Sequence, residues 1–229
     1  MNKLLKAKNR CKKYRKRILE ISQLVSALHI GGSFSCVEIV DCIYNMLKRK
    51  KDTFILSKGH AGILQYVVLN DLKIISKKDL YNFQQKGSFL GVHPDYGNPG
   101  IEASTGSLGH GPAIAAGMAL ATKNKKNCFY VVLSDGELQE GSVWEAALLI
   151  SSLKLNNIIF IIDNNNFQSA VKLTDSHATL YPIDKKFLSF GWNSAICNGH
   201  NSMEIYNKIK NRPKRKPFAL IAKTIKGYP

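Results

Sequence analysis

The sequence predicts an α/β protein with a doubly wound, mostly parallel β-sheet flanked by helices. Residues 128–133 and 157–162 are continuous apolar runs of strand length, and residues 143–153 between them have the length and pattern of a helix. A strand, a helix and a strand within about 35 residues form a βαβ unit, and fully apolar strands are typical of a parallel sheet covered on both faces. Ligands of such sheets bind at the carboxyl ends of the strands.

The segments before this unit predict two helices and a short strand. Apolar residues recur at helical spacing across residues 4–28, and the Gly-Gly pair that follows is expected to end that helix. Ser35 has the position of an N-cap, with Glu38 three residues later as in a capping box, for a helix to about Leu47. Residues 54–56 then predict a strand.

A long loop and several further elements complete the predicted architecture. Residues 86–112 are rich in Gly and Pro, and a stretch of this length without its own element is expected to be functional. The small apolar residues 112–121 predict a helix packed closely on the sheet. Residues 187–197 and 218–222 predict strands, with a helix at 202–210 between them.

Composition indicates one soluble domain over residues 1–229. The chain is 45% hydrophobic, enough for a single core, and its five cysteines show neither a CxxC pair nor a zinc-ligand spacing. Free thiols are typical of a reducing compartment. The basic N-terminus is not followed by an apolar signal region, and the sequence has no apolar run of membrane-spanning length. We therefore expect a cytoplasmic protein that does not bind membranes.

The strongly basic balance has two interpretations. The net charge is +17, from 33 Lys and Arg against 16 Asp and Glu, and much of it lies in runs at Lys3–Arg17, Lys48–Lys51, Lys123–Lys126 and Arg212–Lys216. Aromatic platforms for single-stranded nucleic acid do not accompany these runs. We expect solvated helix faces rather than a nucleic-acid interface, with phosphorylated small molecules steered by the positive surface.

Polar side chains follow both central strands. Asp135 and Gly136 come after the first strand, and Asn165 comes after the second. Neighbouring strands of a βαβ unit end at the same edge of the sheet, so these side chains are expected to reach one ion. A carboxylate and an amide oxygen suit Mg²⁺ when phosphates supply other ligands, and Gly136 lets the backbone approach a ligand closely. The alternative is an N-cap at Asp135 and an ordinary Asn-rich turn.

This pattern is similar to the GDG…NN signature of thiamine-diphosphate enzymes, with Ser134 in place of the first Gly. The resemblance implies that Asp135, Asn165 and the carbonyl of Phe167 hold Mg²⁺ against the diphosphate. It also implies the thiamine-diphosphate-binding fold of the family's diphosphate-binding (PP) domain.

Further motifs, in order along residues 15–227, resemble the transketolase family. They are HIGGS from His29, LSKGHA at 56–61, GVHPD at 91–95, GIEASTGSLGHG at 100–111 and DGELQEG at 135–141. In that family the matching positions have known roles. The resemblance places His60 on the diphosphate, His29 and His93 on the substrate, and Glu140 at a subunit interface. It places three residues of the long loop around the cofactor rings: Gly106, Ser107 and Leu108.

The resemblance implies transfer of a two-carbon ketol unit from a ketose phosphate to an aldose, with thiamine diphosphate and Mg²⁺ as cofactors. The sequence ends just past the strand that closes this domain in the family, so we expect a partner subunit carrying the pyrimidine-binding domain, in an α₂β₂ assembly. Two alternatives stay open: a thiamine-dependent acyloin or deoxyxylulose-type synthase subunit, and a degenerate, non-catalytic subunit. His177 and His200 match no site motif and are expected to be surface or structural residues.

Overall fold

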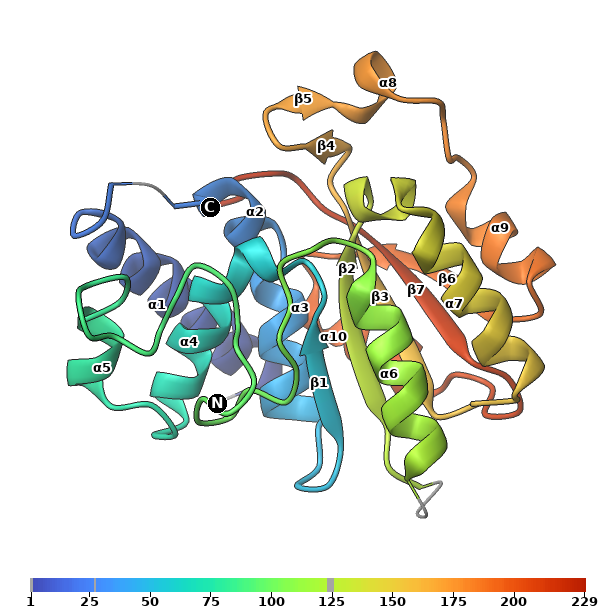
Figure 1. Ribbon diagram of the computed structural model, residues 1–229, viewed down its shortest axis with the longest axis horizontal. Coiled ribbons are helices and arrows are strands. Elements are labelled where there is room, and N and C mark those ends of the chain that lie inside the picture. The colour runs from blue at the N-terminus through green and yellow to red at the C-terminus, as the bar shows by residue number, and fades with distance from the viewer. Residues whose placement is uncertain (1, 27, 123–125) are drawn as a thin grey trace.

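The computed structural model describes residues 2–26, 28–122 and 126–229, and these contain a parallel five-stranded sheet (Figure 1). The strand order is β1-β2-β3-β7-β6, and every neighbouring pair is parallel. The strands are β1 (Thr53–Leu56), β2 (Phe129–Ser134), β3 (Ile158–Asn164), β6 (Asn193–Asn198) and β7 (Phe218–Lys223). The predicted α/β class and parallel sheet are confirmed.

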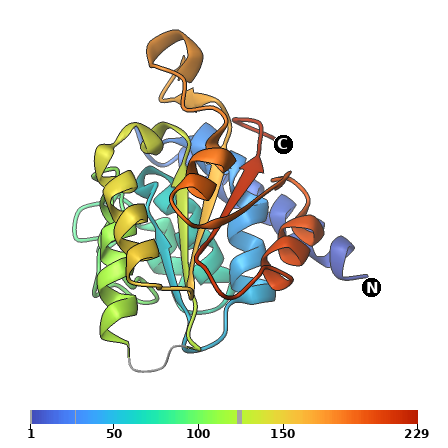
Figure 2. The same ribbon diagram turned by 90° about the vertical axis from the view of Figure 1, so that its right-hand side faces the viewer.

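Helices cover both faces of the sheet (Figures 1 and 2). On one face lie α1 (Lys3–Ser22), α3 (Val37–Cys42), α4 (Gly62–Asp71) and α10 (Ser202–Lys210). On the other lie α6 (His110–Ala121), α7 (Gly141–Ser152) and α9 (Ile183–Ser189). Short elements complete the chain: α2 (Ile30–Ser35), the π-helical turn η1 (Ile43–Leu47), η2 (Gly59–Ala61), α5 (Lys77–Tyr81), η3 (Gly136–Gln139) and α8 (Leu173–Ser176).

The fully apolar central strands fill two separate cores. Tyr130 and Val132 of β2 pack into the core under α1, α3 and α4, whereas Val131 and Leu133 pack into the core under α6 and α7. Side chains alternate between the faces of a strand, so a strand covered on both faces must be apolar at every position. This is why residues 128–133 and 157–162 lack the alternating pattern of a half-exposed strand.

One predicted strand is wrong in its first half. Residues 187–197 contain the end of α9, a turn and then β6, which begins at Asn193. Phe187 lies on α9, where its ring packs against Trp192 at 5.5 Å and Trp144 at 5.2 Å between centroids. A short apolar run does not distinguish a buried helix from a buried strand.

The N-terminal boundaries also differ from the prediction. The first helix ends at Ser22, and the Gly-Gly pair lies inside α2 instead of breaking a helix. The predicted capping box is wrong because α3 is preceded by Cys36 and has no side-chain cap. The Ser35 hydroxyl instead donates to Asp163, 2.5 Å away, and Glu38 forms an ion pair with Arg15.

The basic runs are only partly solvated. Arg15 is buried, donating to Glu38 at 2.7 and 2.8 Å, and Arg10 pairs with the buried Asp41 at 2.6 Å. The rest of the first run is largely exposed. Of the run Lys123–Lys126, all but Lys126 lies outside the described residues.

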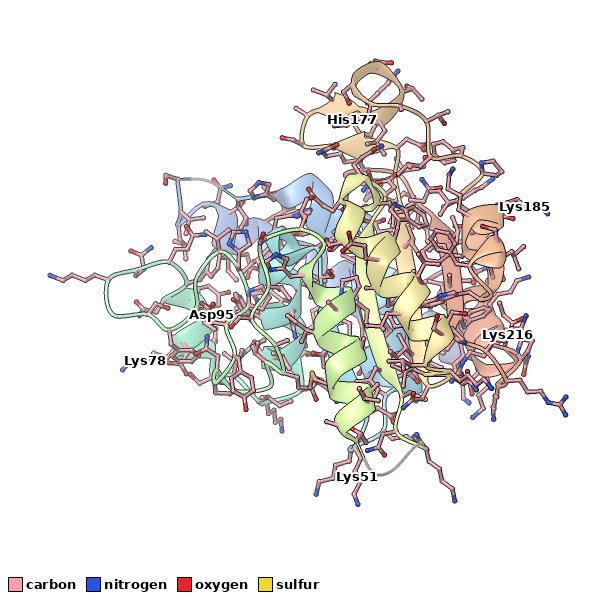
Figure 3. The ribbon with its side chains drawn as sticks, turned by 45° about the vertical axis from the view of Figure 1, so that its right-hand side comes forward. Lys51, Lys78, Asp95, His177, Lys185 and Lys216 are labelled. Atoms are coloured by element: carbon pink, nitrogen blue, oxygen red, sulfur yellow. The ribbon has the colours of Figure 1, made fainter. Side chains whose placement is uncertain are left out.

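One segment stands away from the body beyond the carboxyl edge of the sheet. The hairpin of β4 (Phe167–Gln168) and β5 (Val171–Lys172) and then α8 project there (Figure 1), and His177 lies on this projection (Figure 3). His177 is exposed, as predicted. All five cysteines are free thiols, and none of the described helices is long and apolar enough to cross a membrane.

Candidate active site

A cavity of about 580 Å³ lies at the carboxyl ends of the strands, where ligands of such sheets bind. Its lining comes from segments far apart in the sequence: α2, η2, the loop 86–109, the ends of β2 and β3, the hairpin at 167–170, and Lys226. The predicted residues that line it are His29, His60, His93, Gly106, Leu108, Gly136, Asn165 and Phe167. The structure therefore brings together the three histidines that the sequence singled out.

His60 is half-buried in the wall of this cavity. It lies in η2, directly after β1, with its ring centroid 5.5 Å from that of His29. Burial, reinforced by the charge of Lys58, lowers the pKa of His60 to about 3. The imidazole is therefore neutral at physiological pH, with one ring nitrogen able to donate a hydrogen bond and the other able to accept one.

Close backbone packing holds His93 in the wall of the cavity. Gly106 has a φ of +146°, and a Cβ atom there would lie 2.9 Å from Cγ of His93. A Cβ on Gly59 would lie 2.7 Å from the amide nitrogen of Gly106. Thr105 anchors the loop by donating from its hydroxyl to the Leu56 carbonyl, 2.8 Å away. The Gly-rich loop is thus fixed without forming a helix or strand of its own.

The polar ends of β2 and β3 lie side by side, as predicted, since Ser134 pairs with Asp163 in the sheet register. Asn165 lines the cavity, and its Oδ1 accepts from the Phe167 amide at 3.0 Å. Asp135 is 1% exposed and lies just behind the cavity wall, where it accepts from the Asn166 amide at 2.5 Å. Burial raises the pKa of Asp135 to about 6.

The alternative interpretation of these strand ends is partly correct. Asp135 caps η3 by accepting from the Gly136 amide at 2.9 Å, and Asn166 takes a left-handed turn conformation with φ of +66°. Both carboxylate oxygens of Asp135 accept hydrogen bonds, one from the Gly136 amide and the other from the Asn164 side chain and the Asn166 amide. The first of these oxygens keeps a lone pair for a ligand. Capping and ligand binding are therefore compatible at this edge.

A buried ion pair lies beneath the cavity and was not predicted. Lys58 and Asp163 are paired, and both side chains are 0% exposed. Burial is the largest single influence and lowers the pKa of Lys58, but the charge and hydrogen bond of Asp163, together with Cys36 and Asp135, outweigh it and raise the pKa. Asp163 also accepts from three side chains: Ser35, Thr224 and the Asn165 amide, the last at 3.3 Å. The pair thereby fixes the orientation of Asn165.

A buried glutamate joins three other segments of the wall. Glu137 accepts from the Ser57 hydroxyl, from the Gly109 amide at 2.9 Å and from the Ser134 amide at 3.3 Å. Burial raises the pKa of this carboxyl group. The Ser134 hydroxyl, in turn, accepts from the Glu137 amide at 3.1 Å. The serine that replaces the first glycine of the signature is thus part of this hydrogen-bonded turn.

Besides Asp135, two predicted residues lie outside the cavity wall. Glu140 is exposed beside Gly109, at the start of α7, and Ser107 is exposed and does not line the cavity. An exposed position fits the expected place of Glu140 at a subunit interface.

Lys226 was not predicted, and its side chain also lines the cavity. Its ammonium donates to the Ser169 carbonyl and lies 5.3 Å from the centre of the Phe167 ring. Burial and the charge of Lys58 lower its pKa. The segment before it is held by His200, whose Nε2 accepts from the Ile225 amide at 2.9 Å. His200 is therefore a structural residue, as expected.

The donor set suits a diphosphate and a hard cation. No group of three His, Cys, Asp or Glu side chains able to hold a metal occurs within the described ranges. A metal here must therefore take oxygens from Asp135, the Asn165 amide, a carbonyl such as that of Phe167, and the ligand itself. Lys226 supplies positive charge, whereas that of Lys58 is balanced by Asp163, and the glycine backbone leaves room for close approach. The residues fit the implied cofactor.

Comparison with known proteins gives the family. Residues 28–229 match the model of the thiamine-diphosphate-binding domain of transketolase. This chain belongs to the transketolase family. It is 36% identical over 228 residues to one subunit of apulose-4-phosphate transketolase from Phocaeicola vulgatus, covering 94% of this chain and 81% of the relative. It is 33% identical over 227 residues to 6-deoxy-6-sulfo-D-fructose transketolase subunit SqwG from Clostridium sp., covering 93% and 82%.

Solved transketolases share the fold. The crystal structure of transketolase from Campylobacter jejuni matches with a TM-score of 0.87 and 28% sequence identity, covering 98% of this chain. The chain spans 38% of the length of that transketolase. The α/β architecture is thus that of the thiamine-diphosphate-binding domain of the family.

Proposed function

We propose that this chain is the cofactor-binding subunit of a two-subunit transketolase. The observation that carries the proposal is the convergence of His29, His60 and His93, from three separate segments, on one cavity at the polar ends of β2 and β3. Bound thiamine diphosphate supplies the nucleophilic carbon that the amino-acid side chains lack. The chain's own residues bind it, orient it and handle protons on the substrate.

The proposed cofactor contacts follow the positions of the side chains. Asp135, Asn165 and the Phe167 carbonyl hold Mg²⁺, with Gly136 allowing close approach of the diphosphate. His60, neutral because burial lowers its pKa to about 3, donates a hydrogen bond to a diphosphate oxygen. The loop residues Gly106, Ser107 and Leu108 surround the rings. This assignment gives Ser107 a backbone contact, because its side chain is exposed.

The substrate side of the cavity is assigned to His29 and His93. Ketol transfer creates and consumes alkoxide charge on substrate oxygens, and imidazoles near neutrality can donate to such oxygens and move protons. His29 is exposed at the mouth of the cavity, where an incoming sugar meets it first. Lys226, on the same cavity, is placed to attract a phosphate group.

The relatives' names support the reaction and the need for a partner. Two of them are named as subunits of transketolases that act on apulose 4-phosphate or 6-deoxy-6-sulfo-D-fructose. We infer that this chain likewise transfers a two-carbon ketol unit from a ketose phosphate to an aldose, within sugar metabolism. We infer a second subunit that carries the pyrimidine-binding domain, in an α₂β₂ assembly with Glu140 at its interface.

Reconstitution with the partner subunit tests the proposal. The two chains are co-purified, and aldose and ketose products are followed with thiamine diphosphate and Mg²⁺, offering xylulose 5-phosphate or pyruvate as donor. We expect turnover of the ketose phosphate by the pair, and none by either chain alone. Turnover of pyruvate instead would identify an acyloin or deoxyxylulose-type synthase. Absence of cofactor binding by the assembled pair in calorimetry would identify a non-catalytic subunit.

A further inference from the structure

A second large cavity, of about 610 Å³, lies at the opposite end of the sheet. It is formed where η1 and α10 end and where β2 and β3 begin. Figure 3 shows Lys51 and Lys216 at this amino end of the strands, away from His177 at the carboxyl end. The two cavities therefore lie on opposite edges of one sheet and can be occupied independently.

The charge of this cavity is one-sided. Within the described parts of the chain its lining includes five cationic residues and no carboxylate. Arg49 is largely neutralised by Asp52, to which it donates at 2.8 Å. Lys210 and Lys214 are exposed, and no described carboxylate lies within ion-pair distance of either. The positive charge on this side of the cavity is thus available to an anion.

Arg212 is fixed in place in the wall and keeps an unused donor. Its Nη1 donates to the Ile209 carbonyl at 2.8 Å and its Nη2 to the sulfur of Cys128 at 3.4 Å. Its Nε is buried and has no hydrogen-bond partner among the described residues. A guanidinium held on two sides, with its third donor unsatisfied, is preorganised to bind an oxygen acceptor.

The same wall contains an unused acceptor. The side-chain oxygen of Asn156 is buried without a partner in the described structure, and Asn156 lines the cavity together with Arg212. Tyr130, Tyr206 and Leu47 add apolar surface to the lining. A ligand that satisfies both polar residues must carry an anionic oxygen for Arg212 and a donor, such as a hydroxyl group, for Asn156.

We propose that this cavity is a binding site for a small phosphorylated, hydroxyl-bearing metabolite. Its phosphate lies on Arg212 with Lys210 and Lys214 nearby, its hydroxyl donates to Asn156, and its carbon skeleton packs on the tyrosines. Sugar phosphates and nucleotides share this chemistry. Nucleotides carry in addition an aromatic base that can stack on the tyrosines. The site is independent of the proposed reaction, which takes place at the other end of the strands.

Calorimetry on the chain with its partner, saturated with thiamine diphosphate and Mg²⁺, tests the site. Ribose 5-phosphate and AMP serve as probes, with inorganic phosphate for comparison. We expect one of the two probes to bind tenfold or more tightly than inorganic phosphate, and which one binds identifies the ligand class. Arg212→Gln is expected to weaken this binding at least tenfold. Arg215→Gln removes the same charge from an exposed residue of the same loop outside the cavity, and is expected to change it less than twofold.

Three results would overturn the proposal. Equal weakening by both arginine variants would indicate a diffuse basic surface. If neither probe binds more tightly than inorganic phosphate, the cavity does not recognise a phosphorylated metabolite. Binding that is lost in His93→Ala but kept in Arg212→Gln would place the probe in the active site. If Arg212→Gln lowers the melting temperature of the chain, the exposed Lys210→Gln replaces it, with the same expected loss of affinity.

Discussion

The two ends of the sheet carry cavities of similar size and different electrostatic character. At the carboxyl end, the buried cation Lys58 is paired with a buried carboxylate that also accepts from three side chains. At the amino end, the described lining contains five cations and no carboxylate. Separating the two members of a buried ion pair leaves each charge without compensation, which is costly in free energy. The pair therefore holds the residues around it in place. Exposed cations contribute little to stability, and ligands can reach them.

The largest effect is expected from breaking the buried pair. Lys58→Met leaves Asp163 without its cation, and should lower the free energy of unfolding by about 3–5 kcal/mol. The matched Lys216→Met, at an exposed lysine of the amino end, should change it by less than about 0.5 kcal/mol. Urea denaturation followed by circular dichroism measures both. A loss below about 1 kcal/mol in Lys58→Met would mean that hydroxyl and amide donors alone satisfy Asp163.

The next effect concerns the ligand more than the fold. Asp135→Asn keeps the shape but removes the charge, so the affinity for thiamine diphosphate with Mg²⁺ should fall roughly 100-fold, or about 2–3 kcal/mol. Both carboxylate oxygens of Asp135 accept from N–H donors and an asparagine keeps only one acceptor oxygen, so the cofactor-free variant should also be less stable than the parent by about 1–3 kcal/mol. Calorimetry and thermal melting separate the two outcomes. Arg212→Gln, at the other end of the sheet, serves as the control and should leave cofactor affinity unchanged. If Asp135→Asn also leaves the affinity unchanged, Asp135 is not a ligand of the metal.

Close packing at the carboxyl end gives a third contrast. Gly106→Ala forces a side chain onto a left-handed backbone and against the His93 ring, and should destabilise the chain by about 1–3 kcal/mol. Gly117→Ala, on an exposed helical position with no atom within 4 Å of the added carbon, should stabilise it by up to about 1 kcal/mol. The melting temperature should fall in Gly106→Ala and rise in Gly117→Ala. An unchanged melting temperature in Gly106→Ala would mean that the loop adjusts to the added side chain.

The smallest effect is a change in pH dependence. His60 has a folded-state pKa near 3, below its ordinary value of 6.5, so the unfolded chain takes up a proton that the folded chain does not between these values. Stability contributed by neutral His60 is complete above pH 6.5 and is lost as the pH falls toward 3. One proton sets a ceiling of about 1.4 kcal/mol per pH unit, and the partial exposure of the ring reduces it.

His60→Asn should therefore flatten the dependence of unfolding free energy on pH between 6 and 4. His177→Asn, on the exposed projection, should leave that slope as it is. Urea titrations at three pH values measure the difference. An identical slope in His60→Asn and the parent would show that the imidazole is protonated as easily in the folded chain as in the unfolded one.

The central βαβ unit was predictable because strong local patterns encode it, whereas the three histidines of the cavity were predicted from the resemblance of their motifs to the transketolase family. Apolar runs without alternation indicate covered strands, and the helix between two such strands indicates that they are parallel. The pair of Lys58 and Asp163 joins residues 105 positions apart. Nothing local marks either partner as buried, and a lysine in a glycine-bearing loop is ordinarily exposed.

The errors share a related cause, which is tertiary contact overriding a local signal. Ser35 has the spacing of a capping residue, but the carboxylate of Asp163 takes its hydroxyl. The Gly-Gly pair has the composition of a helix end, yet it lies inside α2. A Cβ at Gly32 would lie 3.2 Å from the His60 ring, and one at Gly31 would meet Lys226 at the same distance. Glycine at these two positions leaves the space that the side chains of His60 and Lys226 occupy.

The position of β7 has a consequence for synthesis of the chain. β7 lies between β3 and β6, although β6 precedes it in the sequence. While the ribosome makes the chain, β6 emerges with no strand to pair with, because its one neighbour in the sheet has yet to be translated. β1, β2 and β3 can associate earlier, since they emerge in the order in which they pair. The growing polypeptide therefore carries an unpaired strand until β7 inserts, which is the interval in which chaperones have most to protect.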